Sequence, residues 1–403
     1  MVYEQRQTGN EVQIYQVGGA VRDRLLKQKI RDIDYVVVGA TIDDMLQLGY
    51  KAVGKDFPVF LHPQTKEEYA LARTEKKISK GYKGFTFYTS PDISIEEDLY
   101  RRDLTINAIA EDKQGLLIDP YSGIKDLKNK KLRHVSNAFA EDPVRILRTA
   151  RFAARFAQLG FTVANETMTL MKKMVNNGEI DALVAERVWK EFESALAEKH
   201  PEVFFQVLRQ CGALQCLLPE IDNLFGVPQV EKWHPEVDTG VHTMMVLQQA
   251  VRLSEQLSGK DKLNKEEQIA LRFSALVHDV GKGITPRHEW PSHKKHEFNG
   301  IKLVKNLCLR FKVPKQICNL ALLVTEYHLL YHRMGELKKG TIIRFFNSID
   351  AFRRPQRLHL FLLACEADSR GRKGFEDIIP EQTALCKHYF KQATQVNVKD
   401  IIA

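Results

Sequence analysis

The chain has 403 residues, and 60 Lys and Arg against 51 Asp and Glu give it a formal net charge of +9 and a pI near 9.1. This length exceeds what one hydrophobic core organises, so we expect two or more domains, and the positive charge favours polyanionic partners. The 6 cysteines show no CxxC spacing, which argues against zinc ribbons and disulfide frameworks. No apolar run reaches the roughly 18 residues of a membrane span, and the N-terminal segment lacks the core of a signal peptide. We therefore expect a cytoplasmic protein with no membrane partner.

The first chemical pattern is a strand-like run that ends in two glycines and a cation, IYQVGGAVR at residues 14–22. Glycines let a backbone approach a phosphate closely, a helix predicted at residues 20–28 would turn its first amides toward an anion, and Arg22 offers a forked donor. Shortly afterwards RDIDYVVV carries Asp32 and Asp34, which share one side of an extended strand and can bind hard divalent cations together. Each pattern alone is usually a plain turn or a solvated pair, but together they predict a metal-dependent phosphate enzyme.

Two basic segments follow in the first half of the chain. Residues 73–88, RTEKKISKGYKGFTFY, are broken by glycine and interleaved with aromatic residues, and they predict either a loop near nucleic acid or a solvated loop. Residues 101–108, RRDLTINA, place Arg101 and Arg102 at a predicted helix start that Asp103 can cap. These arginines can meet phosphate, or they can be solvated beside a structural cap.

The segment EDPVRILRTARFAAR, residues 141–155, predicts a helix with one arginine face. Asp142 is its predicted N-cap, with Pro143 at the first helical position. The arginines recur at spacings of three, three and four, with no acid between them: Arg145, Arg148, Arg151 and Arg155. Solvated faces usually mix both charges, so we expect this stripe to contact phosphate or a base.

Two kinds of secondary structure divide the chain. The first 140 residues mix β-rich runs with glycine-containing turns, which predicts an α+β part. From residue 142 almost to the end, apolar residues recur at helical spacing, which predicts an all-α remainder. Prolines and a glycine interrupt residues 219–240, a segment that would join a middle helical region to a further helical domain.

The helical half carries a second chemical pattern: His242, the adjacent pair His278 and Asp279, and much later Asp368. It resembles the metal-binding pattern of HD-domain phosphohydrolases, in which these residues gather from separate helices. Imidazole and carboxylate together suit a divalent transition metal, Ni²⁺ among them, more than Mg²⁺, and such a metal activates water against a phosphoester. Four more histidines of this region can assist the site or simply lie at the surface: His293, His296, His328 and His332.

Five motifs, in this order, resemble those of bacterial class II CCA-adding enzymes, which are tRNA nucleotidyltransferases: VGGAVRD, RDIDYVVVG, ALARTE, RRDLTINA and EDPVRILRTARFAAR. The resemblance covers nearly the whole chain. It implies an α+β fold class, with a DNA polymerase β-like nucleotidyltransferase head followed by an all-α neck and body and an all-α HD domain. We expect the head at residues 1–140, the neck and body at 141–226, and the HD domain with a helical tail at 227–403.

The resemblance also implies a reaction and its residues. Such enzymes add or repair the 3′-terminal CCA of tRNA from CTP and ATP without a nucleic-acid template, and they release pyrophosphate. Asp32 and Asp34 would be the catalytic residues and hold two Mg²⁺ ions. The residues that match nucleotide contacts are Gly19, Arg22, Arg102, Arg148 and Arg151. Asp142 and Arg145 match the pair that reads the Watson–Crick edge of C or A, and Glu75 is a candidate third acid near the metals.

The HD-containing branch of this family implies a second activity, a metal-dependent phosphatase and 2′,3′-cyclic phosphodiesterase that restores a free 3′-hydroxyl. The partner would be tRNA, and the chain a monomer or weak homodimer. Two other functions stay open: a bacterial poly(A) polymerase, which shares this head, and a tRNA- or nucleotide-binding protein without turnover. The length of the product and the use of CTP distinguish a poly(A) polymerase from a CCA-adding enzyme. Pyrophosphate release distinguishes either enzyme from a binding protein without turnover.

Overall fold

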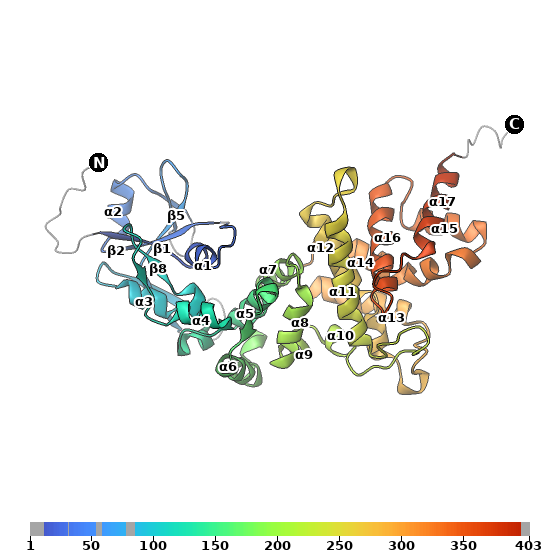
Figure 1. The fold of residues 1–403 in the computed structure, drawn as a ribbon, viewed down its shortest axis with the longest axis horizontal. Coiled ribbons are helices and arrows are strands. Elements are labelled where there is room, and N and C mark those ends of the chain that lie inside the picture. Colours follow the sequence, from blue (N-terminus) through green and yellow to red (C-terminus); the bar gives the residue numbers. More distant parts are fainter. Residues whose placement is uncertain (1–11, 31, 54–58, 78–84, 396–403) are drawn as a thin grey trace. The chain divides into compact units, whose positions relative to one another are not determined.

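The computed structural model describes residues 12–30, 32–53, 59–77 and 85–395 (Figure 1). The chain forms two compact units, Met1–Val184 and Ala185–Ala403. Among the described residues, no helix combines the length and the apolar composition that a membrane crossing needs. The finer domain boundaries at residues 140 and 226 stay a prediction.

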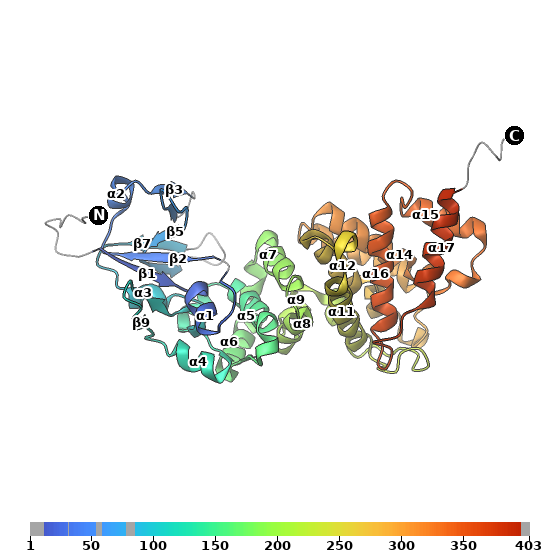
Figure 2. The ribbon, with the colours of Figure 1, turned by 45° about the horizontal axis from the view of Figure 1, so that its top comes forward.

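Unit 1 is built on a seven-stranded sheet with the order β3-β4-β5-β2-β1-β8-β9 (Figure 2). Its strands are β1 (Gln13–Val17), β2 (Asp34–Val38), β3 (Lys51–Val53), β4 (Val59–Leu61), β5 (Glu68–Leu71), β8 (Ala110–Glu111) and β9 (Leu117–Ile118). Among the described residues of this sheet, β2 and β5 are parallel and the other pairs are antiparallel. Side chains of β1 alternate between the two faces of the sheet, so the strand contributes to both apolar clusters. Tyr15 and Val17 enter one cluster, and Ile14 packs against the other.

Short helices and two small sheets complete unit 1. The helices are α1 (Gly19–Leu25), α2 (Ile42–Gln47), α3 (Ile95–Tyr100), α4 (Gly123–Asn129), α5 (Val144–Arg155) and α6 (Asn165–Asn176), with 3-10 turns η2 (Thr105–Asn107), η3 (Asn137–Glu141), η4 (Ala157–Leu159) and η5 (Glu179–Ala182). The small sheets pair β6 (Arg73–Lys77) with β7 (Phe85–Thr89) and β10 (Lys131–Leu132) with β11 (Thr162–Val163). The predicted helix at residues 20–28 is α1, which is shorter. The predicted arginine helix is α5, which begins one residue later than expected.

Unit 2 is helical throughout its described residues. Its helices are α7 (Ala185–Leu196), α8 (Pro201–Gln210), α9 (Ala213–Leu217), α10 (Pro219–Asp222), α11 (Thr239–Gln256), α12 (Lys265–Val277), α13 (His296–Arg310), α14 (Lys315–His332), α15 (Lys339–Ser348), α16 (Pro355–Arg370) and α17 (Glu381–Gln395). The 3-10 turns are η6 (Gly259–Asp261), η7 (Val280–Ile284), η8 (Arg287–Glu289) and η9 (Met334–Glu336). Helices α11, α12, α14 and α16 pack against one another at the centre of the unit (Figure 1).

One glycine permits a close backbone contact in unit 2. A Cβ on Gly281, in η7, would lie 1.9 Å from the backbone oxygen of His296 at the start of α13. Because no side chain fits there, the segment after α12 can lie directly against the first turn of α13. This contact brings the residues that follow α12 next to those that begin α13.

Candidate functional site

In unit 1, strand pairing brings the two glycines and the two carboxylates together. β1 and β2 are antiparallel, and Val17 lies opposite Asp34. Gly18 and Gly19 directly follow Val17, so the end of β1 and the start of β2 form one edge that carries both sequence motifs. The shared position follows from the antiparallel register, in which the end of one strand meets the start of its neighbour.

The carboxylates at this edge favour a bound cation. Asp32 and Asp34 are both exposed and are two residues apart in extended chain. Partial desolvation raises the pKa of Asp34, the nearby Arg102 opposes this shift, and the charge of Asp32 adds to it. A carboxylate whose charged form is disfavoured by a second carboxylate close by fits a divalent ion with oxygen ligands.

Arg102 faces the glycine turn. Gly18 has φ +68° and ψ −123°, and a Cβ on it would lie 2.9 Å from Nη1 of Arg102. The guanidinium of Arg102 is held from the other side by Asp98, whose Oδ2 lies 3.1 Å from Nη2. Asp98 is fully buried, and although burial raises its pKa, Arg101 and Arg102 outweigh that effect and hold the pKa below its usual range. A fixed cation therefore lies beside the turn, at the edge that also carries the carboxylates.

Arg22 lies inside unit 1 and not at the surface of the turn. It is 2% exposed, and its guanidinium contacts Oδ1 of Asp23 at 2.8 Å and the side chain of Asn107. The guanidinium also lies 5.0 Å from the ring centre of Phe152 and 5.1 Å from that of Phe156. In this structure Arg22 joins α1 to α5. Its contact with a nucleotide stays a prediction.

Acids from other segments meet the arginine face of α5. Nε of Arg148 donates to Oδ2 of Asp103 at 2.7 Å, and Nη2 of Arg155 lies 2.8 Å from Oδ2 of Asp23. Burial raises the pKa of Asp103, but Arg148 and the hydrogen bond from Asn107 outweigh it, so the pKa lies well below its usual range. Asp103 does not cap a helix; it joins the turn after α3 to α5.

The predicted base-reading pair lies at the start of α5. Asp142 is half-buried, and its Oδ1 accepts the amide of Val144 at 3.1 Å. Arg145 is 7% exposed and donates to the backbone oxygens of Ala138 and Arg101, each at 2.7 Å. Both side chains are thus fixed by backbone groups, while their predicted role in reading a base is not tested by these contacts.

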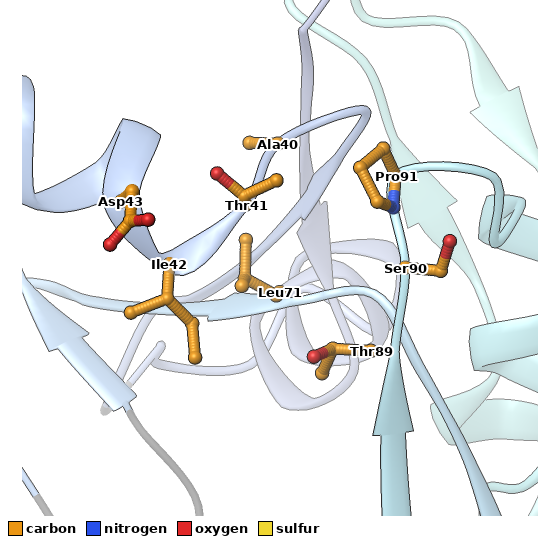
Figure 3. A pocket seen from close by; sticks show the side chains of 8 residues that line it. All are labelled: Ala40, Thr41, Ile42, Asp43, Leu71, Thr89, Ser90 and Pro91. Carbon is orange, nitrogen blue, oxygen red and sulfur yellow. The ribbon is translucent and has the colours of Figure 1, made fainter.

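The described part of unit 1 also has a shallow cavity of about 250 Å³ that the sequence did not indicate (Figure 3). It is lined by Ala40, Thr41, Ile42, Asp43, Leu71, Thr89, Ser90 and Pro91. These residues follow the end of β2, whereas Asp34 begins that strand, so the cavity lies away from the carboxylate edge. The side chain of Glu75 and most of the basic loop 76–83 lie outside the described residues.

In unit 2, three helical segments bring the four predicted HD residues to one point. His242 lies near the start of α11, His278 and Asp279 follow α12, and Asp368 lies in the last turn of α16. Nε2 of His242 is 3.1 Å from Oδ1 of Asp368, and Nε2 of His278 is 3.5 Å from the same oxygen. Nε2 of His278 is also 3.3 Å from Oδ2 of Asp279. All four residues are buried.

The rings are oriented as metal ligands. Nδ1 of His278 faces the backbone oxygen of Ala275 at 2.7 Å, and Nδ1 of His242 faces that of Gly371 at 3.1 Å. Since a carbonyl only accepts, Nδ1 donates and the neutral ring turns the lone pair of Nε2 to the centre. Nε2 of His278 is buried without a hydrogen-bond partner. These features fit a divalent ion.

Electrostatics at this centre also favour a cation. Burial lowers the pKa of His278, but the charges of Asp279 and Asp368 outweigh it and raise the pKa to about 10. Nζ of Lys282, a residue that the sequence reasoning missed, lies 2.5 Å from Oδ2 of Asp279 and donates to the side chain of Gln229 at 2.6 Å. The buried carboxylates therefore attract positive charge from several directions.

The other four predicted histidines of this region differ in the groups that they contact. Nε2 of His332 lies 2.6 Å from Oδ2 of Asp368 and orients that carboxylate. His293 contacts the backbone oxygen of Pro228 at 2.7 Å and the hydroxyl of Thr285 at 2.6 Å, so its ring is engaged elsewhere. His296 and His328 lie on the far side of Asp279. Only their positions in space, which the sequence does not give, distinguish these four.

Known proteins match over nearly the whole chain. The chain is 57% identical to the "Multifunctional CCA protein" of Aliivibrio salmonicida (strain LFI1238) over 392 residues, which are 97% of this chain and 93% of that protein. The chain belongs to the multifunctional CCA protein family. The predicted family and its two kinds of domain are thereby confirmed, and membership implies dependence on divalent metal ions.

Family descriptions and solved structures agree with this membership. Residues 14–133 match "Poly A polymerase head domain", residues 160–225 match "Probable RNA and SrmB- binding site of polymerase A", and residues 239–368 match "HD domain". A CCA-adding enzyme in apo form II is 21% identical with a TM-score of 0.63, over 97% of this chain and 82% of that one. A tRNA nucleotidyltransferase complexed with a primer tRNA and an incoming ATP analog is 23% identical with a TM-score of 0.61, over 95% and 96%. The predicted α+β fold class with an all-α HD domain is confirmed.

Proposed function

We propose that unit 1 adds or repairs the 3′-terminal CCA of tRNA, using CTP and ATP and no nucleic-acid template. The observation that carries this proposal is the register that places Asp34 opposite Val17, so that the carboxylate pair and the glycine turn share one edge beside Arg102. Membership in the multifunctional CCA proteins supports the same reaction.

Asp32 and Asp34 hold two Mg²⁺ ions in this proposal, since exposed carboxylate oxygens on one strand edge suit a small hard cation. The ions, when bound, lower the pKa of the tRNA 3′-hydroxyl and neutralise the leaving pyrophosphate. The 3′-hydroxyl gives its proton to water as its oxygen bonds to the α-phosphorus, and the bond from that phosphorus to the bridging oxygen of the β-phosphate breaks. In this proposal the residues that contact the incoming nucleotide are Gly19, Arg22, Arg102, Arg148 and Arg151, and the buried Arg22 would have to be reached from the glycine turn.

Asp142 and Arg145 select the base. A carboxylate accepts from the exocyclic amino group that both C and A carry, and a guanidinium donates to a ring nitrogen or a carbonyl oxygen. The two backbone oxygens that accept from Arg145 hold its guanidinium in one orientation, as a template requires of its donors. The protein itself then replaces a nucleic-acid template.

The centre of unit 2 hydrolyses phosphate esters at RNA ends, as a phosphatase and 2′,3′-cyclic phosphodiesterase. His242, His278, Asp279 and Asp368 would hold a divalent transition metal, and Ni²⁺ is one candidate, because imidazole is among its preferred ligands. The two activities complement each other. A terminus that ends in a phosphate cannot attack a nucleotide, and its hydrolysis restores the hydroxyl that unit 1 uses.

The charge of +9 suits a polyanionic partner, which in this proposal is tRNA, and we place the chain in the cytoplasm as a monomer or weak homodimer. A poly(A) polymerase shares the head family, but the similar curated protein is a CCA protein. A non-catalytic binding protein would not need the carboxylate pair. We therefore retain CCA addition as the function.

The experiment that tests turnover is release of pyrophosphate from CTP in the presence of Mg²⁺ and a tRNA that lacks its 3′ CCA. We expect release that depends on the tRNA and is lost in Asp34→Asn. Absence of release from a folded wild-type chain would contradict the proposed function.

A further inference from the structure

The segment that precedes α11 carries an exposed indole. Trp233 lies between α10 and α11 and is 56% exposed. The other two tryptophans of the chain serve packing. Trp189 is buried and packs edge-on against the ring of Phe192, and the half-buried Trp290 donates from Nε1 to the backbone oxygen of Thr285 at 3.1 Å. A ring as exposed as that of Trp233 gives up most of the free energy that burial would provide, which is typical of a residue that binds a ligand.

Arg372 ties this segment to the end of α16. Its Nη1 donates to the backbone oxygen of Trp233 at 3.3 Å, and its Nε donates to that of Ser369 at 2.8 Å. Ser369 directly follows Asp368, one of the predicted metal ligands. The backbone of Trp233 is therefore fixed beside the residues that carry Asp368.

The residues that follow Trp233 contact a second predicted metal ligand. The ring centre of His234 lies 4.7 Å from that of His242, at an interplanar angle of 80°. Oε1 of Glu236 lies 2.9 Å from Nδ1 of His242 and 3.2 Å from Nδ1 of His234. The exposed indole is thus one residue away from a ring that packs on His242.

Cationic side chains lie beside the indole. Nζ of Lys232 lies 4.7 Å from the ring centre of Trp233. Lys373 is exposed, and its amide donates to Oε2 of Glu236 at 3.3 Å, which places it next to the same segment. Sites for single-stranded nucleic acid combine cations that meet the phosphates with an aromatic ring that stacks on a base. The surroundings of Trp233 supply both parts.

We propose that Trp233 stacks on the base of an RNA 3′-terminal nucleotide whose terminal phosphate is bound at the centre of unit 2, while Lys232 and Lys373 contact the phosphates that precede it. The base and the 3′-phosphate of one nucleotide are joined to the same ribose, so a ring close to the metal ligands can engage the base while the centre holds the phosphate. Stacking tolerates every base, which suits an enzyme that acts on RNA ends of different sequence. The inference deepens the proposed phosphohydrolase and rests on it for the reaction, whereas the base site can be tested without turnover.

Two phosphate esters separate base stacking from hydrolysis. Adenosine 3′-phosphate carries a base, and glycerol 2-phosphate is an ester of a secondary alcohol without one. In the full-length chain loaded with Ni²⁺, we expect Trp233→Ala to raise KM for adenosine 3′-phosphate by roughly 5–150-fold, the value of one stacked base, with kcat unchanged. KM for glycerol 2-phosphate should not change. Trp233→Phe keeps an aromatic ring and should restore most of the affinity.

Phe298→Ala is the matched control. Phe298 is 60% exposed and lies on α13, two residues after His296. Nε2 of His296 is 3.1 Å from Oδ1 of Asp279, so this side of the helix faces the centre and Phe298 lies on another side. We expect the substitution to leave both KM values unchanged.

Tryptophan fluorescence supplies a measurement that does not need turnover. The 3 tryptophans of the chain all lie in unit 2, so their emission reports on that unit. Titrating the full-length chain, stripped of metal ions, with adenosine 3′-phosphate should quench the emission to saturation, and Trp233→Phe should abolish the quenching.

The outcomes separate the base site from the proposed reaction. Saturable quenching without hydrolysis would contradict the phosphohydrolase and leave the base site standing. Hydrolysis with an unchanged KM for adenosine 3′-phosphate in Trp233→Ala, or with an equal rise in KM for both esters, would overturn the base site alone. Neither hydrolysis nor quenching by the wild-type chain would overturn both.

Discussion

Arg148 donates from Nε to Oδ2 of Asp103 across 2.7 Å, and this contact joins α5 to the turn after α3. Asp103 is 6% exposed and also accepts from the side chain of Asn107, which in turn contacts Arg22. One buried carboxylate thus fixes, directly or through Asn107, two arginines that the family resemblance assigns to nucleotide binding. The site of unit 1 depends on these internal contacts as much as on its surface residues.

Replacing this carboxylate tests its role. We expect Asp103→Asn to lower the free energy of unfolding of unit 1 by roughly 1–3 kcal/mol at pH 7, a modest value because the side chain of Arg148 is 37% exposed. The pKa of Asp103 is depressed in the folded chain, so its stabilisation is present above the unfolded pKa of about 3.9 and is lost as the pH falls below it. Denaturant unfolding at several pH values should therefore show the difference shrinking in acid. Exposed Asp43→Asn is the control, and a difference that grows in acid would contradict the assignment.

The glycine turn gives a second prediction. Gly18→Ala places a methyl group 2.9 Å from Nη1 of Arg102 and in a backbone conformation that costs roughly 1–3 kcal/mol. We expect a higher KM for both CTP and ATP, because the guanidinium must move from its position beside the carboxylate edge. Gly49→Ala is a matched control, since it has φ +83° and open space around its Cβ. Equal effects of the two substitutions on KM would show that strain alone is responsible.

A substitution in the site of one unit should leave the activity of the other unit unchanged. Asp34→Asn removes a metal ligand of unit 1, and we expect nucleotide addition to fall by roughly 10³-fold or more, since a bound metal supplies several kcal/mol of charge stabilisation. Hydrolysis of a 2′,3′-cyclic phosphate should be unaffected. His278→Gln should give the reverse result. If either change abolished both activities in a chain that still unfolds cooperatively, the division between the sites would be wrong.

Base selection can be separated from stability at the start of α5. We expect Asp142→Ala to lower discrimination of CTP and ATP against UTP and GTP by roughly 5–150-fold, the value of one base contact, with a small change in Tm. Arg145→Ala should lower both discrimination and Tm, because its buried guanidinium serves two backbone oxygens. Competition between nucleotides for incorporation, with a thermal melt of each variant, measures both. Unchanged selectivity in Asp142→Ala would remove that residue from the proposed template.

Local sequence patterns predict which residues lie close together when a single strand pair or a single helix brings them there. The nearness of the glycines to Asp34 follows from one antiparallel pair, and the arginine face of α5 follows from helical spacing. The sequence could not show that Arg22 is buried, because its partners Phe152 and Asn107 are far along the chain. In contrast, a spacing that resembles HD-domain phosphohydrolases predicted His242, His278, Asp279 and Asp368 as one set. His296 and His328 carry no such signal, since only the packing of α13 and α14 brings them to Asp279.

The most direct test of the central claim is extension of a tRNA that lacks its 3′ CCA, with Mg²⁺ and with CTP alone, ATP alone or both, resolved at single-nucleotide length. If unit 1 adds CCA, two residues are added with CTP, and a third appears only when ATP is also present. A long ladder with ATP alone would contradict this account in favour of a poly(A) polymerase, and no extension at all would favour a binding protein without turnover.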